Sequence, residues 1–142
     1  MREIKHIVIH CTATPQSAKV ASIQRYWREV QGWKSPGYHY IVDQHGFTAR
    51  LAPDEAICNG VAGFNRNALH VSYIGGVDAS GKPLDNRTPA QRDALYSIVQ
   101  RWAAKYPTAK ILGHCDFPKV AKACPCFDVK KWCEELGLKH NR

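Results

Sequence analysis

Hydrophobic and polar positions alternate near the start of the chain. Over residues 4–10 this period of two predicts a strand, which places Ile7, Ile9 and Cys11 on one face and His10 on the other. A strand that only filled a core would not need a histidine where it ends. The pattern therefore assigns Cys11 to the apolar set, whereas His10 points elsewhere.

Three later segments have the spacing of amphipathic helices. The second has the clearest start, because Thr88 can cap it, Pro89 suits its first position and Gln91 completes a capping box. Gly32 and Gly137 are placed to end the first and the third helix. The predicted helices cover residues 20–31, 88–106 and 128–136, with apolar faces of Val20, Ile23, Trp27 and Val30 in the first and Leu95, Ile98, Val99 and Trp102 in the second.

Short apolar runs between the helices predict the remaining strands. Residues 37–51 alternate on either side of the turn DQHG, which is typical of a hairpin. Residues 69–77 form a strand that ends at a pair of glycines, and residues 109–114 form a short strand that ends at His114. A long surface loop is expected over residues 52–67, which contain proline, glycine and asparagine.

Strands and helices interleave along the chain, and neither a repeat nor a linker interrupts them. The expected fold is α/β: a central mixed β-sheet flanked by helices, in a single domain over residues 1–142. A chain of 142 residues with 44% hydrophobic residues is large enough for one compact core. Functional residues are expected where strands end and loops begin.

Composition limits the binding partners and the cellular compartment that are expected for the protein. The formal net charge of +8 favours anionic partners, but the lysines and arginines are scattered and form no recognisable motif, so no nucleic-acid partner is expected. No apolar run approaches the roughly 18 residues of a membrane span, and the first residues lack the features of a secretory signal. We therefore expect synthesis in the cytoplasm, where the cysteines are free thiols or metal ligands.

The candidate chemistry lies at two strand ends. His10 and His114 are each followed by a cysteine, and alternation sends the two side chains of each pair to opposite faces. The segment KVAKACPCFD, with Cys124 and Cys126, begins shortly after His114. Two imidazoles and one thiolate suit Zn²⁺, and three protein ligands with one open position describe a catalytic zinc site.

Other interpretations of these residues remain open. Each histidine can be a hydrogen-bonded structural residue, and His114, Cys115, Cys124 and Cys126 can form a closed structural zinc site. A thiol nucleophile with His10 as its base is excluded, because adjacent residues of a strand point apart. Four cysteines are also expected to be small buried residues: Cys11, Cys58, Cys115 and Cys133.

Six segments along the chain carry a resemblance to a known family: IVIHCTAT, GYHYIVDQHG, SYIGGVD, TPAQRDALYSIV, ILGHCDFP and KACPCFDVKKW. In this order they resemble the zinc-dependent N-acetylmuramoyl-L-alanine amidases of the phage-lysozyme type, which share the amidase-2 and peptidoglycan-recognition fold. The resemblance covers residues 4–136. It implies hydrolysis of the amide between the lactyl group of N-acetylmuramic acid and L-alanine in peptidoglycan. The alternative is a peptidoglycan-recognition module that binds without cleaving.

The same resemblance assigns roles to individual residues. It implies that His10, His114 and Cys124 ligate Zn²⁺, with Cys124 preferred over Cys126 because the family's cysteine directly precedes a proline. The family's catalytic tyrosine and lysine correspond to Tyr38 and Lys122. Peptidoglycan is the implied partner, reached as by a phage or prophage endolysin after release from the cytoplasm, and a monomer is expected.

The sequence also departs from the family pattern. Asn59 and Gly60 stand in a groove loop where many members carry a histidine, and His70 stands where a small residue, often glycine, is common. These changes leave the proposed metal site intact, but they affect the groove and therefore leave its substrate preference open. His45 and His70 are either extra polar contacts or, on the simpler interpretation, a turn residue and a strand residue.

Overall fold

The computed structural model describes residues 2–138. Within this range the chain folds as a mixed sheet with helices, as expected for the α/β class. The elements are β1 (His6–Cys11), α1 (Val20–Glu29), β2 (Tyr40–Val42), β3 (Thr48–Arg50), the short 3₁₀ helix η1 (Asn65–Asn67), β4 (Ala68–Tyr73), α2 (Pro89–Lys105), β5 (Lys110–Gly113), the short 3₁₀ helix η2 (His114–Asp116) and α3 (Val129–Leu136).

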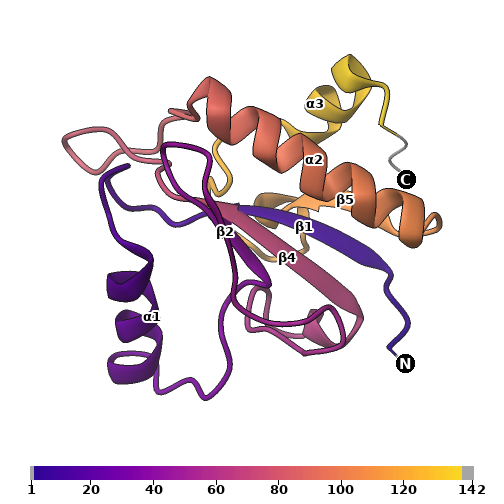
Figure 1. Ribbon diagram of the computed structural model, residues 1–142, viewed down its shortest axis with the longest axis horizontal. Coiled ribbons are helices and arrows are strands. Elements are labelled where there is room, and N and C mark those ends of the chain that lie inside the picture. Colours follow the sequence, from indigo (N-terminus) through magenta and orange to yellow (C-terminus); the bar gives the residue numbers. More distant parts are fainter. Residues whose placement is uncertain (1, 139–142) are drawn as a thin grey trace.

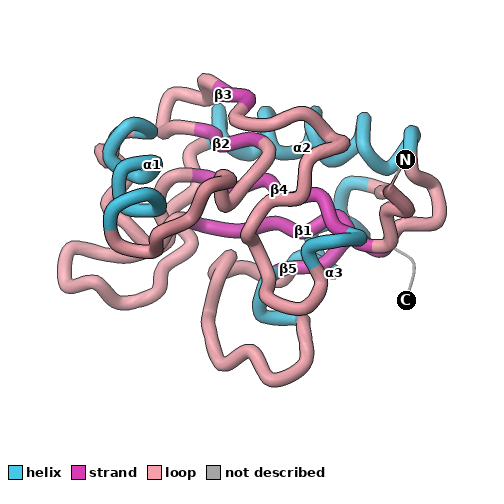
Figure 2. The backbone as a smooth tube through the Cα atoms, turned by 90° about the horizontal axis from the view of Figure 1, so that it is seen from below, coloured by secondary structure: helices cyan, strands magenta, loops and turns pink. Residues whose placement is uncertain are grey.

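The sheet has five strands in the order β3-β2-β4-β1-β5, which can be followed from top to bottom in Figure 2. β1 is parallel to both of its neighbours, β4 and β5, and β2 is parallel to β4. β3 pairs antiparallel with β2 and closes the predicted hairpin. The carboxyl ends of the four parallel strands therefore meet at one edge of the sheet.

The two faces of the sheet pack against different elements. Ile7, Ile9 and Cys11 lie in the main core with residues of α2 and α3, so the predicted alternation along β1 is confirmed. Figure 1 shows α2 crossing the sheet while α1 stands apart from it. Helix α1 covers a separate cluster, in which Ile23 and Trp27 pack with buried residues of the sheet region.

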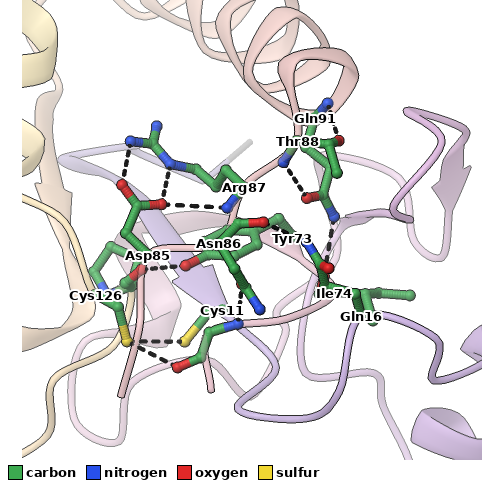
Figure 3. A network of polar contacts seen from close by, with 12 residues as sticks. Cys11, Gln16, Tyr73, Ile74, Asp85, Asn86, Arg87, Thr88, Gln91 and Cys126 are labelled. Carbon is green, nitrogen blue, oxygen red and sulfur yellow. Dashed lines mark hydrogen bonds and ion pairs between the residues drawn. The ribbon is translucent and has the colours of Figure 1, made fainter. Parts of the chain in front are cut away.

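Helix α2 begins with the predicted capping box. Thr88 Oγ1 accepts a hydrogen bond from the backbone N–H of Gln91 at 3.1 Å, and Gln91 Oε1 accepts one from the backbone N–H of Thr88 at 3.0 Å. The buried Gln91 amide also donates to the Val42 carbonyl at 3.3 Å and to the Ile74 carbonyl at 3.0 Å, and Figure 3 shows the second of these bonds. The cap therefore joins the start of α2 to the ends of β2 and β4.

Several predicted boundaries were wrong. α1 ends at Glu29, and Val30 is 67% exposed, so it does not belong to the apolar face of the helix. The strand before His114 ends at Gly113, and His114 begins a 3₁₀ turn instead. The predicted surface loop at 52–67 also contributes buried side chains, such as Cys58 and Val61.

The capping box gives a stability prediction. Replacing Thr88 by alanine removes the cap and its bond to the Gln44 carbonyl, so Thr88→Ala should lower the free energy of unfolding by about 1 kcal/mol. Urea unfolding followed by circular dichroism measures this. The matched control is Thr108→Ala, an exposed threonine beyond the other end of α2. Equal stability of the two variants would contradict the assignment.

Candidate metal centre

Three side chains from distant parts of the chain converge at the carboxyl edge of the sheet. His10 comes from the end of β1, His114 from the first residue of η2, and Cys124 from the loop before α3. Their ligand atoms all lie within 4.8 Å of one another, and His10 Nδ1 is 3.9 Å from Cys124 Sγ. Within residues 2–138 they are the one group of three or more histidine, cysteine or acidic side chains close enough to hold a metal ion.

The loop that carries Cys124 is fastened to the end of β5. The backbone N–H of Cys115 donates to the Cys124 carbonyl at 2.8 Å. Gly113 leaves room for this contact, since a Cβ there would lie 2.7 Å from Pro125 Cδ. The Gly113 N–H donates to the Asp116 carboxylate at 2.8 Å, which fixes the turn that begins with His114. Two of the three candidate ligands are thus positioned by one compact turn.

A polar network supports the same loop from the other side (Figure 3). The buried Tyr73 hydroxyl donates to the Pro125 carbonyl at 2.6 Å. Cys126 Sγ donates to the Gly76 carbonyl at 3.3 Å and lies 3.9 Å from Cys11 Sγ. Cys126 therefore lies against the Cys11 thiol and the glycine turn after β4.

Arg87 fixes the residue that follows Cys126. Its guanidinium forms two hydrogen bonds with the Asp85 carboxylate, at 2.8 and 2.9 Å, and stacks 3.4 Å from the centre of the Phe127 ring. Burial alone would raise the pKa of Asp85, but the bonds from Arg87 lower it below its usual value. The carboxylate therefore stays charged and holds Arg87 against the ligand loop.

The three candidate ligands open into a cleft of about 580 Å³. Tyr38 and Lys122 line the same cleft, so the structure brings together all five residues singled out from the sequence. Tyr38 precedes β2; its ring centre is 4.9 Å from that of His10, and its hydroxyl is 3.5 Å from the Cys11 carbonyl. Further lining side chains come from α1, the loops on either side of it and the loop after β3: Thr14, Ile23, Tyr26, Trp27, Trp33 and Asn59.

Residues 1–127 match the protein family described as N-acetylmuramoyl-L-alanine amidase. This chain belongs to that amidase family. The endolysin of Klebsiella phage KP32 is 36% identical over 138 residues, which make up 96% of this chain and 90% of the relative. The amidase described here is therefore an enzyme that hydrolyses the N-acetylmuramoyl-L-alanine amide.

Solved structures share the fold of this amidase. The Ph2119 endolysin from the Thermus scotoductus MAT2119 bacteriophage superposes with a TM-score of 0.79 at 27% identity, covering 98% of this chain and 88% of that one. Drosophila PGRP-LB has a TM-score of 0.77 at 15% identity and covers 100% and 85%. The expectation of an amidase-2 and peptidoglycan-recognition fold is confirmed. Among the described residues, no helix is long and apolar enough to cross a membrane.

Burial sets the protonation of the two histidines in the amidase site. It lowers the pKa of His10 well below the usual 6.5, and the neighbouring His70 and His114 lower that pKa further. Burial and then the charge of Lys122 lower the pKa of His114 as well. Both imidazoles are neutral at pH 7, which is the form that binds a metal.

The remaining sequence candidates lie outside the cluster. Cys115 is only partly buried and its thiol faces the Asp116 carboxylate, at 3.9 Å, so its expected place in the core was wrong. The cause is the 3₁₀ turn, which breaks the alternation assumed beyond Gly113. Cys11, Cys58 and Cys133 are buried as expected, and the six cysteines are free thiols.

Two histidines and one asparagine beside the cluster were not assigned a role from the sequence. His10 Nε2 is 2.9 Å from His70 Nδ1, and His70 Nε2 is 2.9 Å from Asn65 Oδ1. His39 stacks on His70 with an interplanar angle of 15°. β1 and β4 pair with Val8 opposite His70, which puts His10 and His70 on the same face, but alternation within either strand does not reveal this register. His45, by contrast, is an exposed turn residue as expected.

The network behind the ligand loop gives a second stability prediction. Tyr73→Phe leaves the Pro125 carbonyl without the buried hydroxyl that donates to it, so the free energy of unfolding should fall by about 1 to 3 kcal/mol. Urea unfolding of metal-free protein measures the change. Tyr96→Phe, at a partly buried tyrosine of α2 outside this network, is the control and should unfold like the wild type. A Tyr73→Phe variant as stable as this control would show that the bond does not support the loop.

Proposed function

We propose that the amidase holds one Zn²⁺ through His10, His114 and Cys124, and that Tyr38 and Lys122 act on the scissile amide. The observation that carries this proposal is the convergence of two neutral imidazoles and one thiol on a single point at the floor of a cleft. One face of that point is open to the cleft, as a catalytic site requires.

The donor set fits zinc in chemistry and in spacing. Zn–N bonds of roughly 2.0 Å and Zn–S bonds of roughly 2.3 Å at tetrahedral angles place a nitrogen and a sulfur ligand roughly 3.6 Å apart. The distance between His10 Nδ1 and Cys124 Sγ is 3.9 Å. The Cys11 backbone N–H donates to Cys124 Sγ at 3.1 Å, a contact that holds the sulfur in place. The alternative closed zinc site would need Cys126 as a further ligand, but the Cys126 thiol lies against the Cys11 thiol instead.

A bound Zn²⁺ supplies a Lewis acid that makes water a nucleophile at neutral pH. Lys122 is exposed on the loop beside Cys124 and lines the cleft. Its ammonium group can stabilise the negative charge that develops on the carbonyl oxygen when the amide is attacked. This role needs a charge at the rim of the site and no burial, which agrees with the position of Lys122.

Tyr38 serves as a hydrogen-bond donor. Burial raises the pKa of its phenol, and the nearby sulfur of Cys124 raises that pKa further, so the hydroxyl stays protonated. The contact from this hydroxyl to the Cys11 carbonyl is long, at 3.5 Å, so it forms only a weak bond there. The phenol is therefore available to orient the attacking water or the reacting carbonyl group.

The substrate of the proposed reaction is peptidoglycan, and the bond cleaved joins the lactyl group of N-acetylmuramic acid to L-alanine. The match to a phage endolysin along 90% of the relative supports action on the bacterial wall after synthesis in the cytoplasm. We further propose that residues 1–142 act as one catalytic domain and as a monomer. The cleft, its metal ligands and its two catalytic side chains all come from a single chain.

Zinc binding is tested by substitution of one ligand at a time. His10→Ala and Cys124→Ser should each lose the bound zinc, of about one ion per chain in the wild type, together with amidase activity on purified sacculi. Cys126→Ser is the matched control and should keep both zinc and activity. Removal of zinc from the wild type by a chelator should abolish the release of L-alanine-linked peptides, and added Zn²⁺ should restore it.

Two outcomes would contradict the proposed metal site. Full activity of the metal-free wild type would exclude a catalytic zinc. Loss of zinc in Cys126→Ser with zinc retained in His10→Ala would instead favour the closed structural site.

The catalytic side chains are tested at constant zinc content. Tyr38→Phe and Lys122→Met should each lower kcat on the order of 100-fold, because each removes one preorganised group that stabilises the transition state, while bound zinc is unchanged. Lys119→Met, at an exposed lysine on the same loop that does not line the cleft, should keep the wild-type kcat. An equal effect of Lys119→Met and Lys122→Met would reduce the role of Lys122 to general surface charge.

A further inference from the structure

A chain of buried hydrogen bonds leads away from the Nε2 atom of His10. His10 Nε2 lies 2.9 Å from His70 Nδ1, and His70 Nε2 lies 2.9 Å from Asn65 Oδ1. Both imidazoles are buried, with exposed fractions of 1% for His10 and 0% for His70. Buried polar groups of this kind are costly unless every donor meets an acceptor, so the direction of each bond can be worked out.

The direction is fixed at the far end of the chain. The backbone N–H of Val61 can only donate, and it does so to Asn65 Oδ1 at 2.7 Å. Asn65 Oδ1 is therefore an acceptor, and the proton between Asn65 and His70 belongs to His70 Nε2. A neutral His70 then has a bare Nδ1, which must accept the proton of His10 Nε2. This leaves His10 Nδ1 unprotonated, and that is the atom that faces Cys124 Sγ.

We propose that His70 is a positioning residue for His10: it accepts the Nε2 proton of His10 and so fixes both the orientation and the tautomer in which His10 Nδ1 can ligate the metal. The inference rests on the proposed role of His10 as a zinc ligand. Groups that accept the second N–H of a ligating histidine fix its ring and raise its basicity, and their removal typically weakens metal binding by about 10- to 100-fold.

His39 holds His70 in place from behind. The backbone N–H of His70 donates to His39 Nδ1 at 3.0 Å, and His39 Nε2 donates to the Ala56 carbonyl at 2.8 Å. The same reasoning makes His39 neutral with its proton on Nε2. The rings of His39 and His70 stack with centroids 6.0 Å apart. His70 is thus fixed at its backbone, its ring face and both ring nitrogens.

The loop that packs against His70 has a glycine, Gly60, next to the imidazole ring. A Cβ on Gly60 would lie 2.2 Å from His70 Nδ1 and 2.4 Å from its Cε1, so a side chain there would require the ring or the loop to move. Gly60 also lines the cleft, so the imidazole of His70 fills the space directly beneath the cleft wall. Any side chain at position 60 would push His70 away from His10.

The tautomers can be read directly in the metal-free wild type. Long-range ¹H–¹⁵N NMR spectra of the uniformly labelled protein should show His10 and His70 as neutral rings protonated on Nε2. This measurement needs no substitution and no activity. A His10 ring protonated on Nδ1 would overturn the proposal, because His10 Nε2 would then have no proton to donate to His70.

Zinc affinity provides the second measurement. His70→Leu removes the acceptor with little change of volume and should raise the Kd for Zn²⁺ by about 10- to 100-fold in a chelator competition assay. His70→Asn, which keeps an acceptor oxygen near the place of Nδ1, should recover part of the loss. His45→Ala removes an exposed histidine and should bind zinc like the wild type.

The outcomes separate this inference from the proposed function. An unchanged Kd in a folded His70→Leu variant, with tight binding in the wild type and none in His10→Ala, would overturn the role of His70 alone. A wild type that binds no zinc would overturn the metal site itself. If His70→Leu does not fold, the tautomers of the wild type still decide the question.

Discussion

Parallel pairing of β1 with both of its neighbours is the constraint on which the rest of the site depends. Parallel strands deliver their carboxyl ends to the same edge of a sheet, so the residue at the end of β1 and the residue just after β5 must be neighbours. His10 and His114 occupy these two places. The chain that leaves β5 then returns along the same edge before α3 begins, and this return brings Cys124 beside them.

The sequence was sufficient for the parts of the fold that follow from local chemistry. The alternation along β1, the capping box of α2 and the hairpin near residue 44 depend on neighbouring residues, and the structure contains all three. The resemblance to the amidases supplied the residue roles, and the geometry brings those residues into one cleft. Spacing alone had left the open and the closed zinc sites as alternatives.

What the sequence missed depends on contacts between distant segments. The turn at His114 is fixed by the Asp116 carboxylate and by the loop that packs against Gly113, so a simple strand pattern placed Cys115 wrongly. Burial in the loop at 52–67 arises because Val61 packs with Phe117 and Val8 from other parts of the chain. The hydrogen-bonded pair of His10 and His70 needs the register of β1 with β4, which no local pattern contains.

The close approach of Gly60 to the ring of His70 has a consequence for how such sequences can diverge. Space on this side of β1 admits one large side chain, contributed either by the strand or by the loop above it. A chain that enlarges position 60 must shrink position 70 in the same evolutionary step or within a short series of steps. These two positions should therefore covary across relatives, and the covariation should be strongest where the partner of the β1 histidine is retained.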